Sequence, residues 1–178
     1  MREKALRAII ISLVFLVSLI LQTTILPLLQ FHGVMPDLLL ILIVLTGLFF
    51  GSVKGGAVGF AVGLLEDLLA GRYLGLGALS GFLAGYTVGY LEGKFYRENP
   101  LVPLFLVFLG SILFNGVFFA GREVTGAFSA AVPSVLRRLL LAALYNTFLA
   151  ALLYRPLFRI IFPGGSSRNL QTYGEFYR

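Results

Sequence analysis

The chain has 178 residues, of which 58% are hydrophobic and 12% charged, and its mean hydropathy is +0.94. A water-soluble domain carries about a quarter of its residues as charged side chains, so this composition predicts that lipid is the solvent. The formal charge of +6 does not indicate nucleic-acid binding, because the basic residues stand at the ends of apolar segments. Cysteine is absent and the single histidine, His32, has no second ligand at metal-binding spacing, so no metal or cofactor is expected.

Apolar runs separated by short polar breaks predict membrane-spanning helices, since barrel strands would alternate apolar and polar residues. A helix needs about 20 residues to cross the hydrocarbon layer. The candidate spans are 6–26, 37–53, 55–70, 74–91, 101–120 and 139–158. The first is expected to be retained, because it is long and lacks the small-residue cleavage site of a signal peptide. We therefore predict an all-α, polytopic membrane protein with six transmembrane helices in one domain, 1–178.

The sequence also predicts the structure of two segments outside the spans. The connection 121–138 is the longest, and its "PSVLRR" sequence is expected to form an interfacial turn before the last helix. The end of the chain, 163–178, is polar and rich in turn-forming residues, so we expect a flexible cytoplasmic tail.

The distribution of Lys and Arg predicts the orientation. With the N-terminus in the cytoplasm, ten basic residues lie on the cytoplasmic side and four on the other. The ten are Arg2, Lys4, Arg7, Lys54, Lys94, Arg97, Arg155, Arg159, Arg168 and Arg178, and the four are Arg72, Arg122, Arg137 and Arg138. Both termini are therefore expected in the cytoplasm.

Glycines recur every four residues in three of the predicted helices. The rows are Gly47 and Gly51; Gly55, Gly59 and Gly63; and Gly77, Gly81, Gly85, Gly89 and Gly93. Because four residues turn a helix by roughly 400°, each row forms a stripe along which another backbone can approach closely. The stripes predict either a groove for a partner's helix or packing among the protein's own helices, and packing is the favoured interpretation for most of them.

Two adjacent acids, Glu66 and Asp67, end the third predicted span. Adjacent residues on a helix point about 100° apart, and only Asp67 continues the glycine row. We therefore expect Asp67 to face protein, against Arg72, Asn115, Arg122 or a backbone N–H, and Glu66 to face solvent or lipid headgroups. The alternative is that both acids end a helix in water.

No set of residues in the sequence predicts catalysis. The segment "GALSG" has Ala78 where a membrane serine hydrolase of the Gly-x-Ser-Gly type would have glycine, and His32 lies outside the predicted spans. Asn115 and Asn146 lie deep in spans, where an amide more often joins helices than binds a ligand. The protein is not expected to be an enzyme.

The segment "GFAVGLLEDLLAGRYLGLGAL" is similar to the most recognisable segment of the MreD family of rod shape-determining membrane proteins. The matching residues are Gly59, Phe60, Gly63, Asp67, Leu68, Gly71, Leu74 and Gly75. Ala70 departs from the pattern, where serine is usual. The segments "MPDLLLILIVLTGLFFG" and "LYNTFLAALLYRPLFRI" resemble the second and last spans of the family, so the resemblance covers essentially the whole chain.

The resemblance implies a non-enzymatic scaffold of the bacterial cell-elongation machinery for peptidoglycan synthesis. It would bind the transmembrane helix of MreC and work with MreB, RodA and a class B penicillin-binding protein. The residues expected at a partner-binding or helix-packing site are Gly59, Gly63, Asp67, Gly71, Gly75, Gly77, Gly81, Gly85 and Gly89, with Glu66, Arg72 and Asn115 in secondary positions.

The resemblance also implies an alternative. The MreD family is similar in fold to the substrate-binding S components of energy-coupling-factor vitamin transporters, so the chain could carry a small molecule. A carrier needs a pocket with several convergent polar groups, of which this sequence offers few. Copurification separates the two hypotheses, since a scaffold recovers a single-pass partner and a carrier recovers a vitamin.

Overall fold

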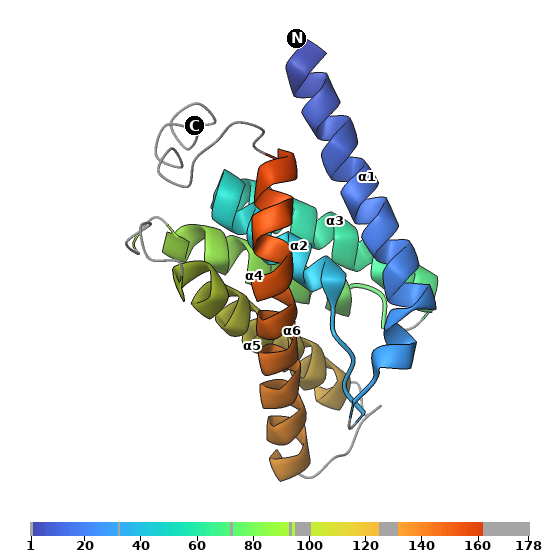
Figure 1. Cartoon of the computed structure of the whole chain (residues 1–178). Helices are drawn as coiled ribbons and strands as arrows, with labels where there is room; N and C mark the ends of the chain where they lie inside the picture. The colour runs from blue at the N-terminus through green and yellow to red at the C-terminus, as the bar shows by residue number, and fades with distance from the viewer. Residues whose placement is uncertain are drawn as a thin grey trace.

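The computed structural model describes residues 2–31, 33–71, 73–92, 94, 101–124 and 132–161, with side chains placed for all of these except 2–8, 132, 158, 160 and 161. Six α-helices and one short 3-10 helix, η1, follow one another along the chain (Figure 1). Their bounds are α1 Arg2–Thr24, η1 Leu26–Leu29, α2 Leu38–Phe50, α3 Ser52–Ala70, α4 Leu76–Glu92, α5 Leu101–Val124 and α6 Val132–Ile161. Within the described residues the only extended pairing is one bridge between Phe31 and Val34, so the predicted all-α class is confirmed.

Helix α2 forms the centre of the bundle. Eleven of its 13 residues are buried, and it packs against α3, α4 and α5. It begins after Asp37, whose Oδ1 accepts a hydrogen bond from the Leu40 N–H at 2.8 Å, and it ends at Gly51, where φ is 87°. At about 1.5 Å per residue α2 is about 20 Å long, which is shorter than the roughly 30 Å of hydrocarbon. The stretch 37–53, predicted as one span, therefore contains a shorter helix and the start of α3.

Helices α3 and α4 pack antiparallel through their glycine stripes. The paired positions are Gly55 with Gly85, Gly59 with Gly81, and Gly63 with Gly77. At each pair, a Cβ added to one glycine would overlap backbone atoms of the other helix. A four-residue step forward on α3 thus matches a four-residue step back on α4, and the absence of side chains lets the two backbones touch. The stripes face each other inside the chain.

The last two helices are longer than their predicted spans. Helix α5 continues to Val124, and α6 begins at Val132. The sequence "PSVLRR", expected to form an interfacial turn, is instead part of α6, and that expectation is wrong. Pro133 fits in the first turn of a helix because the N–H that it lacks would have no intrahelical partner there.

Two helices are long and apolar enough to cross a membrane by length and composition, among the residues that the structure describes. They are Leu101–Val124 and Pro133–Leu157, and shorter apolar helices cover Ile9–Thr24 and Leu38–Phe50. The predicted tail, 163–178, lies outside the described residues.

Candidate functional site

Asp67 joins the end of α3 to the start of α4. Its side chain is 4% exposed, and Oδ2 accepts hydrogen bonds from the backbone N–H groups of Gly75 at 2.8 Å, Gly77 at 3.0 Å and Ala78 at 3.2 Å. The Oδ1 atom accepts from the Gly77 N–H at 3.1 Å. The first N–H groups of a helix have no intrahelical acceptor, and the helix dipole favours negative charge beside them. Asp67 therefore caps α4 from another helix.

Of the donors expected for Asp67, the backbone N–H is the one that the structure brings to it. Asn115 donates through Nδ2 to the carbonyl oxygen of Ser111 on its own helix at 2.9 Å. The guanidinium of Arg122 lies 5.4 Å from the ring centroid of Tyr73. Arg72 lies outside the described residues.

The turn before α4 requires glycine at two further positions of the segment that resembles the MreD family. Gly71 follows α3 in the left-handed conformation, with φ 61°, and Gly75 precedes α4 with φ 96°. Side chains with a Cβ rarely adopt these angles, so glycine here brings the turn back towards Asp67. Both glycines shape the turn.

Glu66, which is expected to face solvent or lipid headgroups, instead contacts α1. Its side chain is partly buried, and Oε1 accepts a hydrogen bond from Nε2 of Gln22 on α1 at 2.9 Å. The Oε1 atom of Gln22 in turn accepts from the Leu39 N–H in the first turn of α2 at 3.1 Å. Glu66 is thereby tied through one amide side chain to both α1 and α2.

A second set of hydrogen bonds extends from the start of α2 to α5 and α6. Asn146 on α6 accepts through Oδ1 from the Asp37 N–H at 2.8 Å, and its Nδ2 donates to Ser111 Oγ on α5 at 3.2 Å. Asn146 is 1% exposed and Ser111 is fully buried. We call Gln22, Asp37, Glu66, Ser111 and Asn146 the polar layer. It joins α1, α2, α3, α5 and α6 around the start of the central helix.

Most of the polar layer is not predicted from the sequence. Asn146 is expected to join helices, and the structure places it so, whereas Asn115 bonds within its own helix. Gln22 is a polar residue inside an apolar helix, and Asp37 directly precedes an apolar run, which is typical of an N-cap. These two signals were available in the sequence.

Replacing Asn146 tests the polar layer. Asn146→Leu is expected to destabilise the protein by about 1–3 kcal/mol, because the Asp37 N–H and the Ser111 hydroxyl both lose a buried partner. Thr147→Val is the matched control, since Thr147 Oγ1 donates only to the Ala143 carbonyl of its own helix, at 2.7 Å. Thermal unfolding in detergent measures both variants. Equal melting temperatures for the two would contradict a role for Asn146 between helices.

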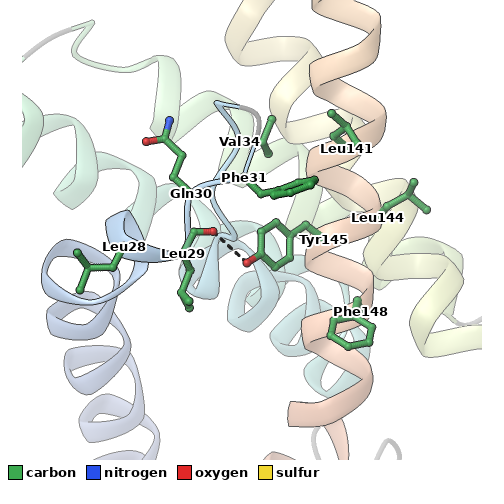
Figure 2. Close-up of a pocket in the computed structure, with 9 residues that line it drawn as sticks. All are labelled: Leu28, Leu29, Gln30, Phe31, Val34, Leu141, Leu144, Tyr145 and Phe148. Atoms are coloured by element: carbon green, nitrogen blue, oxygen red, sulfur yellow. Dashed lines mark hydrogen bonds between the residues drawn. The ribbon is translucent and has the colours of Figure 1, made fainter.

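An apolar cavity of about 480 Å³ lies between α6 and the connection from η1 to α2 (Figure 2). Its lining residues are Leu28, Leu29, Gln30, Phe31, Val34, Leu141, Leu144, Tyr145 and Phe148. The hydroxyl of Tyr145 donates to the Leu29 carbonyl at 3.0 Å and holds the two walls together.

In the part of the chain that the structure describes, no group of three or more His, Cys, Asp or Glu side chains could hold a metal ion.

The helices are apolar, two of them pack closely through glycines, and the buried polar groups hydrogen-bond to one another. These features are typical of a helical membrane protein. The family model of the rod shape-determining protein MreD matches residues 2–161. The chain therefore belongs to the MreD family, and the resemblance stated from the sequence is confirmed. Neither a curated protein nor a solved structure matches the chain. Family membership makes it a membrane protein and indicates a role in rod shape determination.

Proposed function

We propose that the protein is a non-enzymatic scaffold of the cell-elongation machinery that binds the transmembrane helix of MreC. It is a multi-pass protein of the bacterial inner membrane with both termini in the cytoplasm, and it works with MreB, RodA and a class B penicillin-binding protein. The family match over 2–161 and the excess of basic residues on the predicted cytoplasmic side support this role. The short helix α2 is compatible with a membrane location, because other helices surround it.

The surface for MreC cannot be the paired glycine stripes, because α3 and α4 cover each other's glycines. Helix α4 instead exposes a row of large side chains on its outer face. The row consists of Leu79, Phe82, Tyr86 and Tyr90. It covers eleven residue steps, or about 16 Å of helix. We call it the α4 row.

The exposure of Tyr86 is the main observation that supports the α4 row as the docking surface for MreC. It stands near the middle of α4, is 42% exposed and stacks on Phe82 with ring centroids 5.7 Å apart. Its hydroxyl has no hydrogen bond among the described residues, whereas the Tyr90 hydroxyl accepts from Lys94 Nζ at 3.0 Å near the helix end. Lipid hydrocarbon offers the Tyr86 hydroxyl no acceptor, and a partner helix can offer one. Aromatic side chains are also the commonest anchors of protein interfaces.

The mechanism is lateral docking of one helix on a stiff surface. The glycine contacts and the Asp67 cap fix α4 against α3, so the α4 row is held in one position before the partner arrives. Binding to a fixed surface loses less conformational entropy than binding to a mobile one. MreC would then be held in a set orientation relative to the synthases outside the cell.

Replacing Tyr86 tests the docking surface. Tyr86→Leu is expected to lower the recovery of tagged MreC at least about tenfold, because an aromatic anchor and its hydroxyl are lost together. Phe148→Leu is the matched control, since Phe148 is exposed on α6, which does not contact α4. Co-purification from detergent-solubilised membranes measures recovery, and thermal unfolding checks that both variants remain folded. Equal recovery with both variants would remove the α4 row from the proposal.

The same co-purification tests the carrier alternative. A carrier would retain a small polar molecule in the absence of MreC, detectable by mass spectrometry of the denatured sample. The apolar cavity gives this alternative little support, because Gln30 and Tyr145 alone have polar side chains among the described residues that line it. The residues of the polar layer hydrogen-bond to one another or to backbone groups of the chain.

A further inference from the structure

The apolar cavity is part of a groove that runs along one face of α6. Its wall on α6 is formed by residues that lie within about 60° of one another around the helix axis, at about 100° per residue. They are Leu141, Leu144 and Phe148, and Arg137 continues the same face one turn before Leu141. The opposite wall is the connection from η1 to α2, held to α6 by the bond from Tyr145 to Leu29 (Figure 2).

Two arginines stand at one end of this groove. Arg137 and Arg138 are both exposed, and neither makes a hydrogen bond or an ion pair with any residue that the structure describes. Arg155 and Arg159 are also exposed, near the other end of α6. From Arg138 to Arg155 the helix rises about 26 Å, close to the roughly 30 Å of hydrocarbon. The two arginine pairs therefore lie at the two headgroup levels of a bilayer that α6 crosses.

The depth of the groove matches one leaflet. From Arg137 to Phe148 the helix rises about 16 Å, and half of the hydrocarbon layer is about 15 Å. An acyl chain that begins at the headgroup level would end near Phe148.

We propose that this groove binds an anionic phospholipid, with one acyl chain along Leu141, Leu144 and Phe148 and the phosphate group at Arg137 and Arg138. The cavity of about 480 Å³ lies in the size range of small-ligand sites, and its largely apolar lining suits a hydrocarbon chain. The arginines supply the charge that distinguishes an anionic headgroup from a neutral one. This site is separate from the α4 row and does not depend on the contact with MreC.

Native mass spectrometry of the purified, delipidated full-length chain tests the proposal. The probes are phosphatidylglycerol and phosphatidylcholine with identical acyl chains. The wild-type protein is expected to retain phosphatidylglycerol preferentially. Arg137→Gln with Arg138→Gln should weaken phosphatidylglycerol binding roughly 30-fold, because each arginine near an anionic headgroup contributes about a fivefold factor. Arg137→Lys with Arg138→Lys should keep most of the preference.

Two further variants separate the acyl groove from general charge effects. Leu144→Trp fills the groove and should lower the binding of both lipids, whereas Arg155→Gln with Arg159→Gln, at the opposite end of α6, should leave both unchanged. Thermal unfolding confirms that each variant is folded. Equal retention of the two lipids by the wild-type protein, or unchanged binding in the Arg137 and Arg138 double glutamine variant, would overturn the proposal. Competition by inorganic phosphate as strong as by phosphatidylglycerol, or displacement of the lipid by the transmembrane helix of MreC, would also overturn it.

Discussion

Gly59→Ala is expected to destabilise the protein by about 3 kcal/mol, the largest effect of any single added methyl group that the fold implies. A Cβ at this position would overlap the carbonyl oxygen and carbon of Gly81 on α4. A flexible side chain could move aside, but backbone atoms held in a helix cannot move without separating the two helices. Thermal unfolding of the purified protein in detergent measures the loss.

Gly116→Ala is the matched control for this substitution. Gly116 lies in α5, and a Cβ added there would meet no atom within 4 Å outside its own helix backbone. Alanine has the higher helix propensity, by about 1 kcal/mol, so this variant should be as stable as the wild type or slightly more stable. If Gly59→Ala unfolds at the same temperature as Gly116→Ala, the two glycine stripes are not in contact.

Asp67→Asn is expected to cost about 2–3 kcal/mol, whereas Glu66→Gln should cost less than about 1 kcal/mol. The Asp67 carboxylate accepts from three backbone N–H groups, and an amide would replace one acceptor oxygen with a donor while removing the charge that favours the start of α4. The Glu66 carboxylate accepts from Gln22 Nε2, and the amide oxygen of the variant can accept the same bond.

Both acid variants can be compared by thermal unfolding and by recovery of MreC. Asp67→Asn should also lower the recovery of MreC, because a loosened α4 no longer holds the α4 row in place. Equal and negligible losses of stability for both variants would show that Asp67 is not needed to cap α4.

The sequence predicts which residues pack between helices better than it predicts which helices they join. Spacing alone identified the rows containing Gly59 and Gly81 and placed Asp67 on the same face as the α3 row. It could not show that the two rows meet, because a stripe on one helix carries no information on the direction or register of the next helix. The antiparallel pairing of α3 and α4 is decided by the turn at Gly71 and Gly75, which depends on backbone angles.

Helix ends were harder to predict than helix positions. Hydropathy locates apolar residues, so it placed the start of the last helix after Arg138, although α6 begins at Val132. It also carried the second span past Gly51, where the backbone breaks between α2 and α3. The angular position of Glu66 alone predicts that it faces solvent or lipid headgroups. Its contact with Gln22 depends on where α1 lies, which no local pattern in the sequence encodes.

Site-specific photo-crosslinking in membranes tests the central claim most directly. A photoreactive residue is placed at Tyr86 in the α4 row and, as a control, at Leu152, which is exposed on α6. The chain is co-expressed with full-length MreC, and crosslinked peptides are identified by mass spectrometry. We expect position 86 to crosslink to the transmembrane helix of MreC and position 152 not to do so. Crosslinks to MreC from position 152 alone, or from neither position, would contradict the docking of MreC on α4.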